Sequence, residues 1–109
     1  MMLALLFALT AAEPQYDCYW VRGRMQMYNG SPSLRIWPRK TKRLLGVVSA
    51  KDEDEPLALR VPPNIREHIG WGKAVWANYH VCPTTAERPG WLRMVTVREA
   101  RYVHVVHFD

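Results

Sequence analysis

Arginine, lysine and tryptophan side chains that could bind an anionic ligand are concentrated in the first half of the chain. They alternate along two predicted strands and continue into the connection that follows. Aromatic rings stack on bases or pack on sugar faces, while Arg binds carboxylate or phosphate through paired hydrogen bonds. The pattern predicts a basic and aromatic binding surface. Its candidate residues are Arg22, Arg24, Arg35, Trp37, Arg39, Lys40, Lys42 and Arg43.

These side chains also have a purely structural interpretation. The arginines can keep the outside of a β-structure soluble and guard its strand edges, while tryptophans cover its ends. Trp20 and Trp76 have the outward parity of their predicted strands, and Trp71 and Trp91 flank turns. Large aromatic residues at the rim of a barrel usually pack against it, so we expect at least two of Trp71, Trp76 and Trp91 to be packing residues.

Catalysis is the weaker hypothesis. Four histidines are present, but no catalytic or metal-binding motif contains them. His104 and His107 are three residues apart, which on a strand places them on opposite faces. The chain lacks the serine-hydrolase elbow, the zinc-protease helix motif, the P-loop and the dinucleotide-binding glycines. We therefore expect no catalytic residue, no metal site and no cofactor. A small hydrolase-type enzyme is an alternative, and it needs a histidine beside a carboxylate such as Asp17 or Glu99.

The totals and the first residues indicate one exported domain. A chain of 109 residues has room for a single domain, and a formal net charge of +5 favours anionic partners. Residues 1–12 are uncharged and mostly apolar, end in small residues, and are too short to span a bilayer. They predict a cleaved signal peptide, followed by one domain over residues 13–109 in the periplasm or outside the cell.

Alternation of apolar and polar residues predicts five strands, joined by turn-forming residues. Gly23 interrupts the first strand, where a bend or bulge would let it serve two sheets. A short helix is predicted over residues 61–70, with Asn64 as its N-cap and Glu67 completing a capping box. The tail over residues 102–108 extends the last strand or pairs with an edge. The predicted strands cover residues 18–28, 34–37, 44–48, 73–82 and 91–98.

The order of these elements is that of an OB-type barrel, with five strands and one short helix between the third and fourth. In that arrangement the first and fourth strands pair antiparallel. Cys18 begins the first strand and Cys82 ends the fourth, so pairing brings the two cysteines together. The sequence therefore predicts a mostly β, OB-type barrel with a Cys18–Cys82 disulfide, which fits an exported protein.

Three segments, residues 28–37, 43–47 and 81–90, resemble those of a group of small exported bacterial proteins with no assigned activity. The resemblance supports export, paired cysteines and a single domain, and it implies no catalytic residue. We expect a non-enzymatic binding or interaction module of the cell envelope, whose partner is an anionic envelope component or a protein. An OB domain that binds single-stranded nucleic acid is the first alternative.

Overall fold

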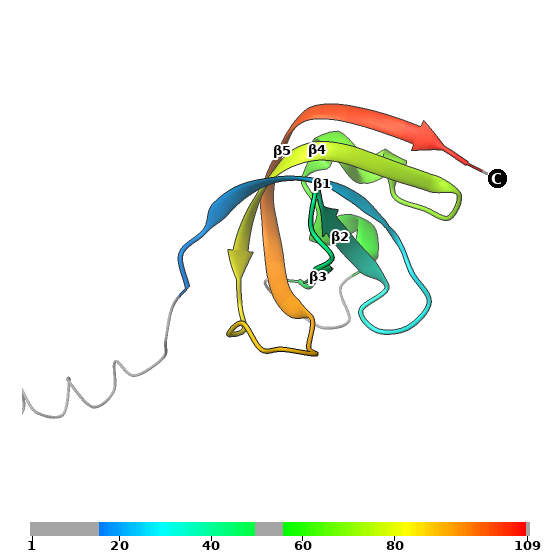
Figure 1. Ribbon diagram of the computed structural model, residues 1–109. Coiled ribbons are helices and arrows are strands. Elements are labelled where there is room, and N and C mark those ends of the chain that lie inside the picture. The colour runs from blue at the N-terminus through cyan, green and yellow to red at the C-terminus, as the bar shows by residue number, and fades with distance from the viewer. Residues whose placement is uncertain (1–15, 50–55, 109) are drawn as a thin grey trace, which may run out of the picture.

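The computed structural model describes residues 16–49 and 56–108, and these form a mostly β structure (Figure 1). The predicted signal peptide over residues 1–12 lies outside the described residues, as does the acidic run over residues 52–55. The elements are the strands β1 (Tyr19–Met27), β2 (Leu34–Pro38), β3 (Leu45–Val47), β4 (Lys73–Pro83) and β5 (Arg93–His107), with the 3-10 helices η1 (Leu57–Arg60) and η2 (Pro63–His68).

The five strands form one sheet that closes in a ring. The order around the ring is β1-β2-β3-β5-β4, and β4 pairs with β1 to complete it. All neighbouring strands are antiparallel except β3 and β5, which are parallel. In Figure 1, β1, β4 and β5 are long curved strands, whereas β2 and β3 are short. The predicted antiparallel pairing of the first and fourth strands is confirmed.

Gly23 is the point at which β1 acquires its second neighbour. β1 pairs with β4 from Tyr19 onward and with β2 only from Gly23 onward, without a bulge in either register. A Cβ atom at Gly23 would lie 2.8 Å from both Cγ2 of Ile36 and the carbonyl oxygen of Trp37. The glycine therefore allows β2 to approach β1 closely. The predicted bulge is not found, and β1 belongs to one sheet rather than two, so the role of Gly23 is this close approach.

Apolar side chains from alternate positions of the strands fill the ring. Tyr79 is fully buried at its centre, and its hydroxyl donates a hydrogen bond to the carbonyl oxygen of Val75 at 2.5 Å. Burial raises the pKa of the Tyr79 phenol above its usual range, because the phenolate would lose its hydration. The other large, fully buried side chains are Met25, Leu34, Ile36, Val47, Ile65, Val75, Val81 and Val95.

The connection between β3 and β4 contains two 3-10 helices instead of the predicted single helix over residues 61–70. Pro62 is the N-cap of η2, and no side chain caps it, so the prediction for Asn64 was wrong. Prolines fix the backbone dihedral φ and lack an N–H donor, which favours a short 3-10 turn at this point. Asn64 instead donates a hydrogen bond from Nδ2 to the carbonyl oxygen of Ala100 at 2.8 Å. Ile65 is buried, as expected.

The tail extends the last strand, which is one of the two predicted outcomes, so that β5 runs to His107. The register between β4 and β5 shifts opposite Ala77, where Tyr102 has a left-handed φ of 56°. This is the geometry of a β-bulge, in which one strand contributes an extra residue. The bulge keeps both halves of β5 paired with β4, and places His104 opposite Trp76.

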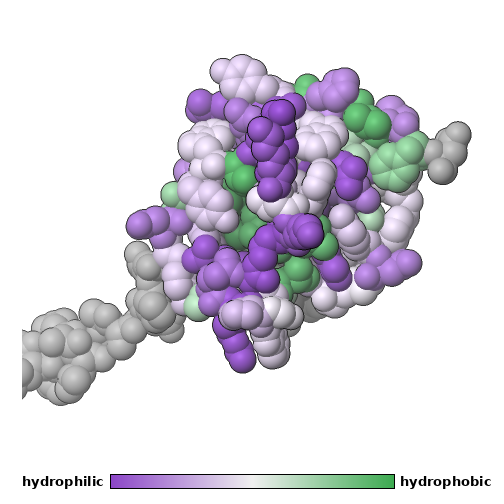
Figure 2. Space-filling view, in the orientation of Figure 1, coloured by the Kyte–Doolittle hydropathy of each residue, from purple (hydrophilic) through white to green (hydrophobic). Residues whose placement is uncertain are grey.

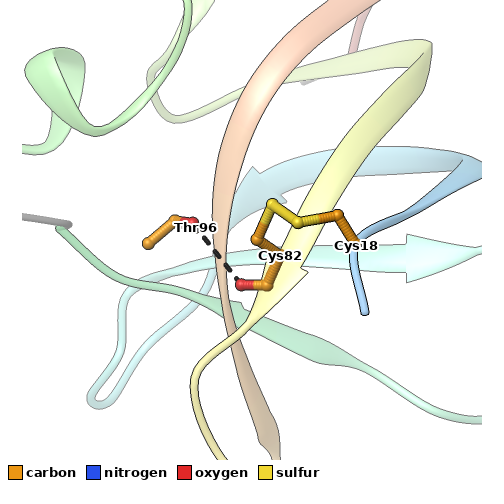
Figure 3. Close-up of a disulfide and its surroundings, with 3 residues drawn as sticks. All are labelled: Cys18, Cys82 and Thr96. Carbon is orange, nitrogen blue, oxygen red and sulfur yellow. Dashed lines mark hydrogen bonds between the residues drawn. A yellow bond between two sulfur atoms is a disulfide. The ribbon is translucent and has the colours of Figure 1, made fainter. Parts of the chain in front are cut away.

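Cys18 and Cys82 are at disulfide-bonding distance, with their Cα atoms 4.1 Å apart (Figure 3). The proximity of the two cysteines follows from the antiparallel register of β1 and β4, in which their neighbours Tyr19 and Val81 are paired. Thr96 of β5 donates a weak hydrogen bond from Oγ1 to the carbonyl oxygen of Cys82, at 3.4 Å. The predicted cysteine pair is therefore confirmed, and it joins the start of β1 to the end of β4.

Candidate functional site

The outer face of the sheet carries a row of side chains from four strands, which we call the Arg24 row. It consists of Trp37 on β2, Arg24 on β1, Trp76 on β4 and His104 on β5, each opposite the next. The Arg24 guanidinium carbon lies 5.0 Å from the ring centroid of Trp37 and 5.9 Å from that of Trp76. These are cation–π distances, so two rings flank one cation.

The electrostatics of Arg24 are unusual for a half-buried arginine. Its Nε atom is buried and has no hydrogen-bond partner in the described part of the chain. The two flanking rings also meet each other edge to face, with centroids 6.1 Å apart. The Trp37 ring is itself held in place, because its Nε1 donates a hydrogen bond to the carbonyl oxygen of Thr41 at 2.6 Å. Arg24 is therefore positioned by aromatic rings and has unused donor capacity.

A second aromatic and cationic group lies on the same outer face, closer to the disulfide. Trp20 on β1 stacks on its cross-strand neighbour His80 on β4, with ring centroids 4.8 Å apart. The guanidinium of Arg101 on β5 lies 4.8 Å from the Trp20 ring centroid. Trp20 and Arg24 are four residues apart on β1, a separation of about 13 Å along an extended strand. The two groups thus form one elongated surface.

Arg22 lies between these two groups and contributes to structure as well as charge. Its guanidinium NH1 donates to the carbonyl oxygen of Tyr102 at 2.7 Å and to Oδ1 of Asn78 at 3.3 Å. The first contact satisfies a carbonyl at the β5 bulge, where regular pairing is interrupted.

Figure 2 shows one view of the molecule, in which hydrophilic side chains cover much of the surface and strongly hydrophobic areas are small.

Acidic side chains do not neutralise the Arg24 row. In the described residues, Glu99 pairs with Arg101 at 3.3 Å, and Glu87 pairs with Arg43. Neither Arg22 nor Arg24 has an acidic partner in that part of the chain. The outer face of β1 therefore keeps positive charge that is available to an external anion.

The remaining predicted site residues lie in two other places. Arg35 is at the β1–β2 turn, where it lies over the Tyr28 ring at 5.2 Å and donates from Nε to the carbonyl oxygen of Pro32. The second place is the β2–β3 connection at the opposite end of β2, with exposed Arg39, Lys40 and Lys42 and a partly buried Arg43. The structure thus brings together Arg22, Arg24 and Trp37, but not the whole predicted set.

OB-type barrels usually bind ligands over their second and third strands, and the basic and aromatic surface of this protein lies elsewhere. All three residues of β3 are buried, so β3 offers no exposed side chain to a ligand. The basic and aromatic face lies instead across β2, β1 and β4, because those strands place their outward side chains in register.

Sequence reasoning missed the partners that complete the face. Trp76, His80 and Arg101 come from strands distant in sequence, and only the cross-strand register shows that they adjoin β1. The outward parity of Trp76 and His80 on the fourth strand could have predicted that both lie on the outer face. The prediction that at least two of three tryptophans pack was wrong, since Trp71 is 63% exposed and Trp91 is 60% exposed. Trp71 lies in the turn before β4, and Trp91 directly follows the turn at residues 89–90.

The four histidines do not form a cluster. His80 is opposite Glu99 across β4 and β5, but the Glu99 carboxylate interacts with Arg101 and the His80 ring stacks on Trp20. Within the described residues, no three His, Cys, Asp or Glu side chains are grouped so that they could hold a metal ion. The same residues include no helix with the length and apolar character needed to cross a membrane.

The chain was compared with family models, with curated proteins and with solved structures, and none of the three comparisons gave a match. The site is therefore interpreted from its own geometry.

Proposed function

We propose that the chain is an exported, non-enzymatic binding module of the cell envelope, and that its outer face over β1 and β4 binds an acidic polysaccharide. The observation that carries the proposal is Arg24, held between Trp37 and Trp76 without an acidic partner in the described residues. A guanidinium binds carboxylate or phosphate, while indole rings offer flat apolar faces to sugar rings. An anionic protein segment is the other partner class that this chemistry would accept.

Stability alone does not account for an arginine at this position. A buried donor without a partner costs about 1–3 kcal/mol, whereas an apolar side chain of similar size would pack between the two rings without that cost. The described residues offer Arg24 no acidic partner, and an external anion that pairs with its guanidinium would supply one. The proposed ligand would therefore give this arginine a role that packing alone does not require.

We also propose that the ring is an OB-type barrel. The strand order β1-β2-β3-β5-β4 supports this, as do the antiparallel β1–β4 pairing and the short helix η2 between β3 and β4. The cysteine pair is compatible with an oxidising compartment outside the cytoplasm. Export itself is tested by sequencing the amino terminus of the mature protein, which should begin at Glu13. A mature protein that retains Met1 would contradict export with cleavage.

The binding proposal is tested with alginate, a polymer of uronic acids, and with neutral dextran. We expect alginate but not dextran to bind, and Arg24→Met to weaken alginate binding about tenfold or more, because one charge-assisted contact is lost. The matched control is Arg98→Met, which removes the same charge from an exposed position on β5. Equal weakening by both variants would show a general charge effect and contradict the proposed site.

Single-stranded nucleic acid is the alternative ligand, favoured by the same flanking of a cation with rings. It is tested in the same assay with oligothymidylate. Tighter binding of the oligonucleotide than of alginate, with a steep salt dependence, would support the alternative and overturn the polysaccharide proposal. The Arg24→Met variant should keep or raise its melting temperature in either case, so that a loss of binding is not a loss of fold.

A further inference from the structure

A second surface, made of residues other than those of the Arg24 row, lies at the end of the ring where β4 runs into β5. We call it the basic tip, and it consists of Arg39, Lys40, Lys42, Arg88 and Trp91. The first three belong to the β2–β3 connection and the last two to the β4–β5 connection. All five side chains are exposed. The proposal for this surface is independent of the polysaccharide proposal, because it uses none of the same residues.

The two connections are joined into one surface by Arg43. Its guanidinium forms an ion pair with Glu87 and donates from NH2 to the carbonyl oxygen of Arg88 at 2.8 Å. Glu87 is the acidic side chain of these connections, and Arg43 neutralises it. The four cations of the basic tip consequently have no acidic partner in the described residues, and together they create a local positive field.

Trp91 gives the basic tip an apolar component. Its side chain is 60% exposed, and the guanidinium carbon of Arg88 lies 4.4 Å from its ring centroid. Tryptophan favours the interface between membrane and water, where its apolar ring and its polar N–H are both accommodated. Cations close to anionic lipid strengthen such an attachment. An exposed tryptophan with one cation against its ring, on a surface that carries three more, therefore fits a lipid headgroup layer.

Hydrogen bonds hold both connections in place before any contact with a partner. In the β2–β3 connection, Thr41 donates from Oγ1 to the carbonyl oxygen of Pro38 at 2.9 Å. In the β4–β5 connection, Thr85 accepts from the Met94 amide at 3.0 Å through Oγ1, and its carbonyl accepts from Nε of Arg93 at 3.1 Å. A surface that is ordered in advance loses less conformational entropy on binding.

We infer that the basic tip docks the protein on an anionic phospholipid surface, with Trp91 entering the headgroup region. The net charge of +5 agrees with attraction to such a surface. The chain also enters the ring at this end, where Tyr16 lies 5.4 Å from the Arg93 guanidinium. Docking in this orientation directs the opposite end of the ring away from the lipid and leaves the outer face of β1 and β4 alongside it, open to solvent.

The test is co-sedimentation of the protein with vesicles of phosphatidylglycerol and phosphatidylcholine, compared with vesicles of phosphatidylcholine alone. We expect binding only to the anionic vesicles. The double variant Lys40→Ser, Lys42→Ser should lower the partition coefficient about tenfold or more, given the usual contribution of each cation near such a surface. Arg98→Ser with Lys73→Ser removes equal charge elsewhere and should have a clearly smaller effect.

The tryptophan is tested by a matched pair of variants. Trp91→Ser should weaken vesicle binding, and Trp71→Ser should not, although both rings are exposed to a similar degree. The two residues lie at opposite ends of β4. The inference is overturned if the wild-type protein ignores anionic vesicles, or if Trp71→Ser and Trp91→Ser have equal effects. Arg24→Met should retain vesicle binding, which separates this surface from the polysaccharide site.

Discussion

At the scale of single residues, two partly or fully buried polar side chains have opposite environments. Tyr79 is enclosed by the core and donates its hydroxyl proton to a neighbouring carbonyl, so its polar group is satisfied. Arg24 lies between two rings on the outer face with a buried, unpartnered Nε. Buried polar groups are normally satisfied within the fold. Tyr79 thus serves stability, and the environment of Arg24 agrees with the proposal that this residue serves an external partner.

The raised pKa of Tyr79 predicts a loss of stability in alkali. The folded state holds the phenolic proton at a pH where the unfolded chain releases it. The free energy of unfolding should therefore fall as the pH rises above about 10, the ordinary pKa of tyrosine, by up to about 1.4 kcal/mol per pH unit. Below that pH the contribution is fully present. Urea denaturation at a series of alkaline pH values measures this slope.

The control for that measurement is a pair of phenylalanine variants. Tyr79→Phe should reduce the alkaline slope and also cost about 1 kcal/mol at neutral pH, because the hydrogen bond to Val75 is lost. Tyr102→Phe removes a hydroxyl from a side chain that is 77% exposed and should leave the slope unchanged. An unchanged slope in Tyr79→Phe would show that other groups cause the alkaline unfolding.

At the scale of elements, β1 depends on the absence of a side chain at Gly23. Gly23→Ala should lower the free energy of unfolding by about 1–3 kcal/mol, because the new methyl group would press against a backbone oxygen and Ile36 of β2. Gly70→Ala is the control, since no atom lies within 4 Å of a Cβ built there. Chemical denaturation compares the two. Equal stability of both variants would contradict the close approach of β2.

The strands were predictable from sequence because alternation is local. Tyr79, Ile36 and Val95 stand on the apolar parity of their strands, and all three are buried. The candidate site was only partly predictable. The contact of Arg24 with Trp76 depends on the β1–β4 register, which joins residues far apart in sequence. The exposure of Trp71 and Trp91 could not be predicted from the sequence either, because it depends on the direction in which each turn leaves the sheet.

At the scale of the whole molecule, the cysteine pair links strands that are distant in sequence. Replacing Cys18 and Cys82 together by Ser should lower the free energy of unfolding on the order of 4 kcal/mol, because the unfolded chain regains the freedom of a long loop. Adding reductant to the wild-type protein should have the same effect on its denaturation midpoint. A midpoint that does not change on reduction would contradict a structural disulfide.

The charges of the molecule are also distributed at this scale. Glu87 forms an ion pair with Arg43, and Glu99 forms one with Arg101. Oε1 of Glu67 lies 3.5 Å from Nε2 of His68. In the described residues, positive charge without an acidic partner includes the outer face of β1 and the basic tip. Under the two proposals above, the protein would attach to an anionic lipid layer through the basic tip and hold an anionic polymer on the outer face of β1.

The shortest strand determines how the ring can open. β3 contributes two residue pairs to β2 and three to β5, whereas β1 and β4 share eight. Separation at β3 would turn the closed ring into a curved open sheet and leave the longer ladders intact. The disulfide crosses the β1–β4 pair on the far side of the ring, so the oxidised protein retains this freedom. The ring is therefore closed covalently on one side and by only a three-residue strand on the other. Among the strands, backbone amide hydrogen exchange should be fastest in β3.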